Sequence, residues 1–441
     1  MNNLILKCLL LIRTILDYYM EITHIIKIED RAYILQKTAY EITLNDDNIT
    51  VIYVPVESVD AYKTLNPDLN IKGECYNRYS INKPEYYDEA TIICSTETNP
   101  KLMSVLYANN LCANENYMTL AEAKAVTVIT DILNGGNGNE VETFNEFKYF
   151  TNVTEIPNNF AANNTTLREI TLPLSATSIG QTAFAITSAG EKEGKVSALT
   201  KVDGVENIVT VNPGAFQKAG KLQYLNFTNK LTTISGIAAF KECKNMERIG
   251  DLSNVTTVGT GSTFMECIKL KQMNFTKKLT SLPNSAFREC HELESVGDLS
   301  GVTTMGNTVF YRTYKLKKLN LPNVTVLNQT AIFKANELTE LDISKVTRLT
   351  NEGAIGDIPL INKINLPAVN QIDKKWSIAF SAYDDKSLNI EINFGLPYSE
   401  ITFASKSILC DTHHQLFITF NGQPATQEQI EYIVEYLADE D

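Results

Sequence analysis

The chain has 441 residues, 44% of them hydrophobic and 21% charged, and its formal net charge is -13 at pH 7. This length exceeds that of one compact core and predicts several domains or one elongated array. The acidic balance argues against nucleic acid and anionic membranes as partners, because phosphate binding needs clustered Lys and Arg. Eight cysteines in this length are too few for a disulfide scaffold.

Residues 1–19 are apolar but are interrupted by Lys7, Arg13 and Asp17. No small-residue cleavage site follows them, and the apolar run is too broken for a good membrane-spanning helix. We interpret this segment as an amphipathic lead or as a misplaced start, with Met20 as the alternative start. We therefore find no clear export signal and expect no membrane insertion.

Residues 20–115 contain no repeat. The pattern "TVIYVPVESVDAYKTLNPDLN" predicts an apolar strand, a turn at Pro55, and a short helix from Ser58 that stops before Pro67. The stretch "TIICSTETN" predicts a further strand. We expect a small α+β or β module here.

Residues 116–150 are predicted to form capping helices and a linker. Thr119 and Glu122 match a capping box at the start of "TLAEAKAVTVITDILNGG", whose glycines end the helix. Thr143 and Glu146 match a second box, which opens "FNEFKYF". An open solenoid end exposes its core, so this segment should cover the array that follows. The residues expected to plug it are Phe144, Phe147 and Phe150.

A period near 23 residues organises the region 151–395. Phenylalanines recur at steps of 24, 24, 23, 23 and 23 residues, at Phe216, Phe240, Phe264, Phe287, Phe310 and Phe333. Phe160 and Phe184 extend the series toward the N-terminus, with an insertion near residues 185–198 before Phe216. A period of this length held over so many units predicts a solenoid.

Each unit contains an alternating apolar pair, such as Leu225 and Phe227, which predicts a short half-buried strand. A second strand-like segment, a polar turn and the phenylalanine follow. Stacked units repeat about every 4.8 Å, so about ten units build a rod on the order of 50 Å long. In "GDLS" units the pair is one residue further apart, as in Ile249 and Leu252, which predicts a local bulge.

Cys243, Cys267 and Cys290 each lie three residues after their phenylalanine. Other units hold Thr187, Ala219, Thr313 and Asn336 at this position. A position that accepts these residues is a small packing slot, where a free cysteine fits well. Thiols one unit apart also raise the alternative of a metal site, but no histidine or carboxylate shares the column and no CxxC occurs. We expect neither a metal nor a disulfide.

The segments "LPLSATSIGQTAF", "LTSLPNSAFRECHELESV" and "LPNVTVLNQTAIF" resemble the BspA-like leucine-rich repeats, with a unit near LxxLxLPxxVTxIxxxAFxxCxx. The resemblance covers residues 141–395, and Ile355 replaces the phenylalanine in one late unit. It implies a mainly β leucine-rich repeat solenoid with short helical and turn segments. It also implies bacterial cell-surface adhesion and binding of host proteins. Similar repeats occur in phage and protozoan proteins, and none of this implies a catalytic centre.

Residues 396–441 are predicted to form a C-terminal helical cap. Further strands lead to "TQEQIEYIVEYLADED", where Thr426 and Gln429 match a capping box. The apolar face of this helix is expected to hold Ile430, Ile433, Val434 and Leu437. The segment caps the array or forms an oligomer contact, with its acidic tail in solvent.

The only cluster with metal-ligand residue types is "CDTHH" at 410–414. Adjacent histidines on a strand point to opposite faces, so His413 and His414 do not easily join Cys410 on one ion, although a loop would relax this objection. No nucleophile elbow, P-loop or GxGxxG is present. We therefore predict no catalytic residue, no metal and no cofactor.

The outward positions of the repeat strands form the candidate binding surface, here called the strand face. Its residues are polar and of mixed charge: Tyr224, Asn226, Arg248, Gln272, Asn274, Lys318, Asn320, Glu340, Asp342, Lys363 and Asn365. Such a row suits a hydrophilic protein or glycan partner held by many hydrogen bonds. The alternative is a solvated sheet face stabilised by side-chain ladders.

We expect a non-enzymatic recognition or adhesion protein that is secreted or held at a cell surface and binds a protein or glycan there. The alternative is a phage virion component, a tail or receptor-binding protein, for which a missing export signal is no objection. A homo-oligomer through the N- or C-terminal module is compatible with both.

Overall fold

The computed structural model describes residues 25–28, 31–34, 51–55, 71–74, 91–380 and 388–437. The expectations for residues 1–19, for Met20, for the helix from Ser58 and for the acidic tail lie outside these residues. The chain divides into two compact units, Met1–Ala123 and Lys124–Asp441. The division falls inside the predicted linker at 116–150.

The first unit contains a four-stranded sheet in the order β1-β2-β3-β4. Its strands are β1 (Ile25–Ile28), β2 (Arg31–Ile34), β3 (Val51–Pro55) and β4 (Ile71–Glu74). β1 pairs with β2 in the antiparallel sense, whereas the two other pairs are parallel. Strand β3 ends at Pro55, where the sequence predicts the turn.

A second sheet of this unit pairs β5 (Ile92–Ser95) with β6 (Tyr117–Thr119). Between them lies α3 (Pro100–Ala108), which the sequence analysis missed. Asn99 caps this helix by accepting a hydrogen bond from the Leu102 N–H at 3.2 Å, and Pro100 occupies its first turn. The helix buries Leu102, Met103, Val105 and Leu106.

The predicted capping box of Thr119 and Glu122 is present, but its helix is short. The Thr119 N–H donates to Glu122 at 2.7 Å, and Thr119 Oγ1 accepts from the Glu122 N–H at 3.3 Å. The helix, α4 (Leu120–Ala125), nevertheless ends long before the predicted glycines. The β-branched run at 126–130 explains this, because its side chains lose χ1 freedom in a helix.

The second predicted capping box is wrong. Thr143 and Phe144 form strand β7 (Thr143–Phe144), and no side-chain cap precedes the 3-10 helix η5 (Asn145–Tyr149). Pairing of β7 with β9 (Glu169–Thr171) fixes Thr143 in the sheet, so the threonine cannot act as a cap.

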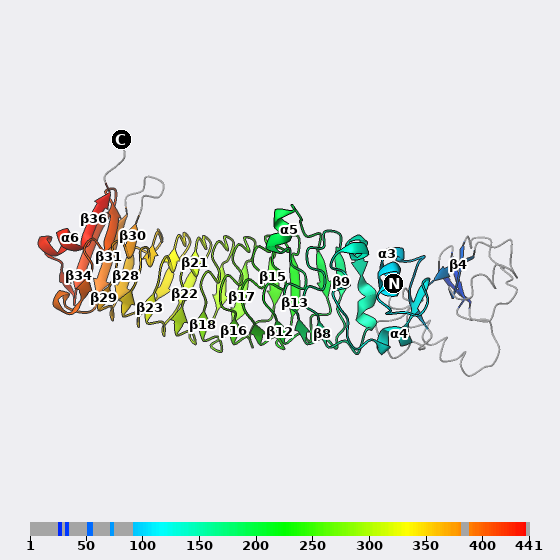
Figure 1. Cartoon of the computed structure of the whole chain (residues 1–441). Coiled ribbons are helices and arrows are strands. Elements are labelled where there is room, and N and C mark those ends of the chain that lie inside the picture. The colour runs from blue at the N-terminus through cyan, green and yellow to red at the C-terminus, as the bar shows by residue number, and fades with distance from the viewer. Residues whose placement is uncertain are drawn as a thin grey trace. The chain divides into compact units, whose positions relative to one another are not determined.

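The second unit is a β-solenoid of about eleven turns, which confirms the predicted leucine-rich repeat fold. In Figure 1 its strands lie in rows along different sides of the coil. The first row holds the strand face and comprises β7, β9, β11 (Lys201–Asp203), β13 (Tyr224–Phe227), β15 (Arg248–Gly250), β17 (Gln272–Phe275), β19 (Ser295–Gly297), β22 (Lys318–Asn320), β25 (Glu340–Asp342), β28 (Lys363–Leu366), β31 (Asn389–Phe394) and β34 (Gln415–Phe420).

The second row consists of two-residue strands, each ending on a buried apolar side chain. It comprises β8 (Glu155–Ile156), β10 (Ser178–Ile179), β12 (Thr210–Val211), β14 (Thr233–Ile234), β16 (Thr257–Val258), β18 (Ser281–Leu282), β20 (Thr304–Met305), β23 (Val326–Leu327), β26 (Arg348–Leu349), β29 (Gln371–Ile372) and β32 (Thr402–Phe403). The third row starts late, with β21 (Phe310–Tyr311), β24 (Ile332–Phe333), β27 (Ile355–Gly356), β30 (Ile378–Phe380), β33 (Ile408–Asp411) and β36 (Val434–Leu437).

Phenylalanine rings form a buried column through the coil. From Phe184 to Phe310, successive ring centroids are 5.3, 5.5, 5.4, 5.6 and 5.6 Å apart, and their planes differ by at most 15°. The periodic phenylalanines up to Phe310 are therefore one stack of core side chains, as the sequence predicts.

The column changes at Phe333, where the prediction is wrong. Strand pairing sets Ile332 opposite Phe310 and Phe333 opposite Tyr311. Ile332 is fully buried and continues the column, whereas the Phe333 ring lies on the outer side, 6.2 Å from the Tyr311 ring. The step from Phe310 is one residue shorter than in the preceding two units, and a shift of one residue turns each side chain to the other face.

The same shift changes which residue occupies the small packing slot in this unit. Ala335 takes the place predicted for Asn336, since the Leu338 N–H donates to the Ala335 carbonyl just as the Leu316 N–H donates to Thr313. Ala335 is fully buried. Ile355 continues the column after Ile332, as predicted for that unit.

The predicted plug covers the first turn of the coil. Phe144, Phe147 and Phe150 are fully buried, and Phe147 stacks on Phe160 at 5.4 Å. Asn164 links the preceding segment to the coil, because its side-chain amide donates to the carbonyls of Leu133 and Gly138 at 2.9 and 3.0 Å. That segment contains the 3-10 helix η4 (Gly136–Glu140).

The strand rows continue past residue 395, the predicted end of the array. β31 and β34 extend the first row, and the short hairpin to β35 (Gln423–Pro424) closes it. The two added strands have the alternating patterns "NIEINF" and "QLFITF". The 3-10 helix η6 (Tyr398–Glu400) lies between the strands.

The C-terminal helix is shorter than predicted. Thr426 and Gln429 do form a capping box, but α6 (Gln427–Ile433) ends before Val434, where β36 begins. Pairing of β36 with β33 takes this segment into the third row, so Leu437 is 38% exposed instead of lying on a helix face. Ile433 and Val434 are buried, and Ile430 is half-buried.

The "GDLS" units contain the predicted bulge. The register between β13 and β15 shifts between Tyr224 and Phe227, and Phe227 pairs with Gly250. The register between β17 and β19 shifts in the same way before the pair of Phe275 and Gly297. Gly250 has φ +92°, and a Cβ there would lie 2.4 Å from the Phe227 carbonyl oxygen. Glycine is required at this position because both the backbone conformation and the space exclude a side chain.

We expect Phe264→Ala to lower the free energy of unfolding by about 3–5 kcal/mol, because it removes a buried ring from the middle of the column. Phe417→Ala is the matched control, since that ring is 52% exposed. Urea unfolding followed by circular dichroism measures both. Equal effects of the two variants would contradict a column that supports the coil.

Candidate binding surface

The strand face is exposed as predicted, with one exception. Tyr224, Arg248, Gln272, Lys318, Glu340 and Lys363 occupy the first outward position of their strands and are all exposed, as are Asn226, Asn274, Asn320 and Asn365 at the second. Asp342 is half-buried and accepts a hydrogen bond from the Ser344 N–H at 3.0 Å. Figure 1 shows their strands, β13, β15, β17, β22 and β28, in one row.

The charged members of the strand face pair across neighbouring strands. Lys318 Nζ lies 2.6 Å from Glu340, and Lys363 Nζ lies 3.0 Å from Glu391. The Arg248 guanidinium lies over the Tyr224 ring at 5.3 Å. These groups are largely exposed, so each contact stabilises the fold only slightly.

The second outward position forms partial amide ladders. Asn274 donates to Asp251 at 2.9 Å and accepts from the Leu252 N–H at 2.8 Å. Further along, Asn393 donates to Asn365 at 3.3 Å and accepts from Thr419 at 2.7 Å. The side-chain ladders weighed in the sequence analysis are therefore present. Within the described coil, the side chains of Asn226, Asn320 and Gln272 form no hydrogen bond of this kind.

Sequence reasoning stopped the strand face too early. Glu391 and Asn393 on β31 continue its two rows, and Phe417 and Thr419 on β34 follow them in register. Phe417 is 52% exposed, which adds a large apolar group to the end of an otherwise polar row. The alternating patterns of these strands were the available signal.

The cysteine slot is closed to solvent, and its thiols form hydrogen bonds with backbone carbonyls. Cys243, Cys267 and Cys290 are fully buried, and each thiol donates to the carbonyl of the phenylalanine one turn earlier at 3.1, 3.1 and 3.0 Å. Burial raises the pKa of Cys267 to about 12 and raises the pKa of the other two as well. A neutral thiol is a poor metal ligand.

The residues of "CDTHH" do not converge. Cys410 is buried in β33, with its pKa raised by burial to about 12. His413 is bonded to Asp411 at 2.6 Å, whereas His414 is buried and its Nδ1 accepts from the Leu388 N–H at 3.3 Å. Among the described residues, no group of three or more such side chains could hold a metal ion.

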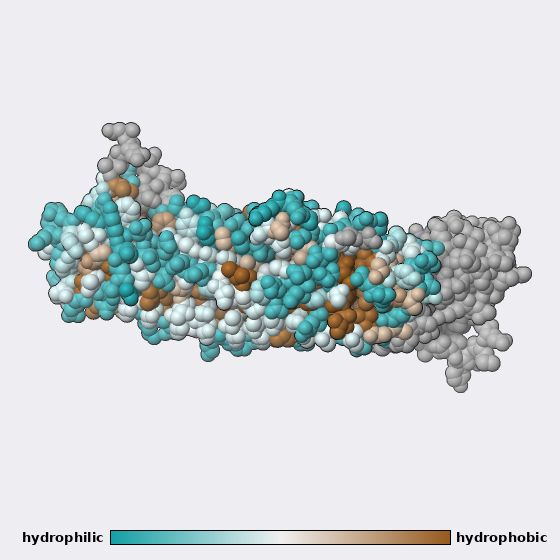
Figure 2. Space-filling model, in the orientation of Figure 1, coloured by the Kyte–Doolittle hydropathy of each residue, from teal (hydrophilic) through white to brown (hydrophobic). Residues whose placement is uncertain are grey.

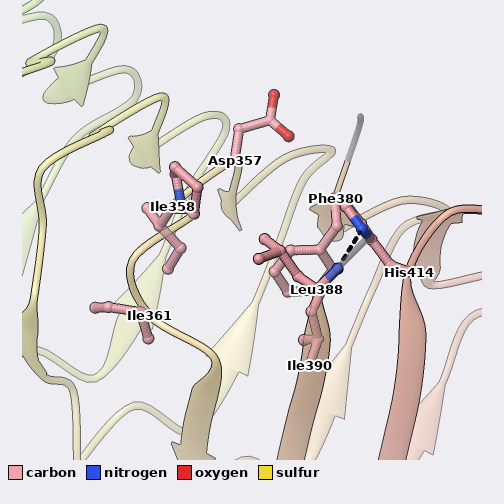
Figure 3. A pocket seen from close by; sticks show the side chains of 8 residues that line it. Asp357, Ile358, Ile361, Phe380, Leu388, Ile390 and His414 are labelled. Carbon is pink, nitrogen blue, oxygen red and sulfur yellow. Dashed lines mark hydrogen bonds between the residues drawn. The ribbon is translucent and has the colours of Figure 1, made fainter. Parts of the chain in front are cut away.

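A small cavity lies beside His414 (Figure 3). Its volume is about 20 Å³, which is enough for about one water molecule and too small for an organic substrate. Ile358, Ile361, Phe380 and Ile390 make it mainly apolar. In Figure 3, Asp357 and His414 lie on different sides of it, so they form no acid–base pair.

The surface of the coil is mainly hydrophilic in the view of Figure 2, and its hydrophobic residues form separate patches. Within the part of the chain that the structure describes, none of the helices has the length and apolar character needed to cross a membrane.

The chain belongs to the BspA-type leucine-rich repeat family. The model described as "BspA type Leucine rich repeat region" matches six copies, at residues 139–193, 194–262 and 260–383, which together exceed half of the chain. The resemblance found in the repeat units is thus confirmed. Among curated proteins, none has significant sequence similarity to this chain.

The solved structures that this chain matches come from several bacteria. A leucine-rich repeat protein of T. pallidum is 22% identical, with 37% of this chain and 72% of that chain covered and a TM-score of 0.33. A leucine-rich cell surface protein of Faecalibacterium prausnitzii is 16% identical, with coverage of 66% and 85% and a TM-score of 0.35. The pneumococcal vaccine antigen PcpA is 13% identical, with coverage of 65% and 78% and a TM-score of 0.36.

We expect the six described cysteines, all buried, to resist Ellman's reagent at pH 8 in the folded protein. Cys8→Ser and Cys75→Ser remove the two cysteines outside the described residues. All six thiols should react after unfolding in guanidinium chloride.

The raised pKa values of the buried thiols also make the stability of the fold pH-dependent, since unfolded thiols ionise near pH 8.5. The contribution of the neutral thiols to the free energy of unfolding is fully present below that pH and is lost as the pH rises toward about 12. Rapid reaction of any native thiol would contradict this structure.

Proposed function

We propose that this protein is a non-enzymatic recognition or adhesion protein that binds a hydrophilic protein or glycan along the strand face. The observation that carries the proposal is the row itself: exposed polar side chains repeat at each strand, and their backbone is held rigid by the coil. A partner meets these groups without ordering them first, so little conformational entropy opposes binding.

The chemistry of the strand face supports recognition more than catalysis. Most of its charges are exposed, Lys318 and Lys363 pair with glutamates of neighbouring strands, and it contains no histidine or cysteine. The amide groups of Asn226, Gln272 and Asn320 offer both donors and acceptors at strand spacing, which suits a broad polar contact. Family membership agrees with this function, because repeats of this type are typical of non-enzymatic binding proteins.

Cell-surface attachment and virion attachment are finer versions of the same proposal. Both use the strand face in the same way and differ in what carries the protein. Co-purification with phage particles would favour the virion, whereas fractionation with the bacterial envelope would favour a surface adhesin.

We expect the double variant Arg248→Glu/Lys318→Glu to lose at least tenfold in affinity for partners found by glycan-array and pull-down screens of the full chain. The melting temperature should change little, because the Lys318–Glu340 pair is exposed on both sides. Lys230→Glu/Lys278→Glu, at exposed turns away from the strand face, changes net charge equally and should bind normally. Equal loss in both double variants would show that overall charge, and not the strand face, governs binding.

A further inference from the structure

A second surface lies on the edge of the coil formed by the turns after the phenylalanine column. We call it the arginine–aromatic patch, and it consists of Arg288, His291, Tyr311, Arg312, Tyr314 and Phe333. All six residues are half-buried. Tyr311 and Phe333 belong to β21 and β24, in a different sheet from the strand face.

Two guanidinium groups lie near the Tyr311 ring. The Arg288 Cζ lies 5.6 Å from its ring centroid, and the Arg312 Cζ lies 5.0 Å from it. Both distances are within the range of cation–π attraction. The Nε atoms of both arginines are buried and have no hydrogen-bond partner. The Tyr311 ring is therefore the contact that holds the Arg288 guanidinium, whereas Arg312 also pairs with Glu289.

Phe333 extends this aromatic surface by one turn. Its ring stacks with Tyr311 at 6.2 Å and 18°. It also lies against Gly353 and Gly356, where an added Cβ would come within 3.1 and 2.9 Å of the ring. The glycines therefore let the ring lie flat on the next turn, and a side chain at either position would lift it.

The patch also contains a histidine–tyrosine pair, His291 and Tyr314. The rings of His291 and Tyr314 are 4.8 Å apart. Glu289 accepts from Arg312 at 3.2 Å and lies 2.9 Å from His291 Nε2. These contacts fix the two rings and neutralise Arg312.

Arg288 is the cation of the patch that remains unpaired. It forms no ion pair within the described residues, whereas Arg312 pairs with Glu289 and nearby Lys315 pairs with Glu292 at 2.7 Å. The chain as a whole carries a formal charge of -13, so this guanidinium over the Tyr311 ring is a local positive group in an acidic protein. Arginine presents a planar fork that matches a carboxylate, and tyrosine and arginine are enriched at the energetic centres of protein interfaces.

We propose that the arginine–aromatic patch is a docking surface for an acidic peptide segment of a partner protein. A carboxylate of that segment pairs with the outer nitrogens of Arg288, and neighbouring apolar groups cover Tyr311 and Phe333. Charge complementarity selects the acidic segment, and the half-buried rings provide the contact area. This surface acts independently of the strand face.

The test uses the full chain and an array of twelve-residue peptides in which glutamate alternates with leucine or tyrosine. Each peptide has a counterpart with glutamine in place of glutamate. Glutamate peptides should bind and their glutamine counterparts should not. Arg288→Gln should weaken binding at least tenfold, and Arg288→Lys should not restore it, because lysine lacks the planar fork.

Lys241→Gln is the matched control, because Lys241 follows Phe240 just as Arg288 follows Phe287 and its loss changes the net charge equally. It should leave peptide binding within twofold, and Arg248→Glu/Lys318→Glu on the strand face should do the same. Thermal melting checks that every variant is folded.

Several results would overturn the proposal. These are equal losses in Arg288→Gln and Lys241→Gln, binding of the glutamine peptides, or no binding of any acidic peptide at millimolar concentration. Binding of heparin oligosaccharides that depends on Arg288, without binding of acidic peptides, would also reject it and assign the patch to sulfated glycans. None of these outcomes bears on the strand face, so the two proposals can fail separately.

Discussion

The buried stack of side chains at one point of each turn constrains the rest of the coil. Neighbouring phenylalanine rings are 5.3 to 5.6 Å apart between Phe184 and Phe310, close to the strand spacing of about 4.8 Å. A residue one step early or late at this point leaves either a cavity or a buried polar group. The turn lengths are therefore nearly constant, and insertions occur only where they can leave the coil, as at α5 (Ser188–Lys192).

This constraint separates the inner positions of the coil from the outer ones. Inner positions accept few residue types: the cysteine slot holds thiols, Ala219 or Thr313, each small enough to lie beside the column. Outer positions carry almost any polar side chain, but each meets the same position of its neighbours about one strand spacing away. Like charges there would repel, and the strand face instead pairs Lys318 with Glu340 and Lys363 with Glu391.

Much of the coil could be predicted from the sequence, because the residue types at fixed spacings indicate both its period and its buried positions. The phenylalanine column up to Phe310, the bulge at Gly250 and the exposure of the strand face all follow from local patterns. The strand at Val434 and the short helix α4 do not, because there sheet pairing or β-branched residues override a capping signal that is itself present. Phe333 and Asn336 were misplaced since a period of 23 residues fits them as well as their neighbours, and only pairing with Tyr311 decides the register.

The shift at Phe333 also explains why the arginine–aromatic patch exists where it does. Moving Ile332 into the column leaves the adjacent phenylalanine on the outer side, where burial in the core is no longer available to it. Its ring instead lies against Gly353 and Gly356 and stacks with the Tyr311 ring, which leaves part of an aromatic surface open to solvent. The exposed part of this ring adds nothing to the stability of a monomeric protein, since only buried apolar surface contributes. The arrangement becomes favourable when a partner covers the ring, and the neighbouring guanidinium of Arg288 determines which charge that partner must carry.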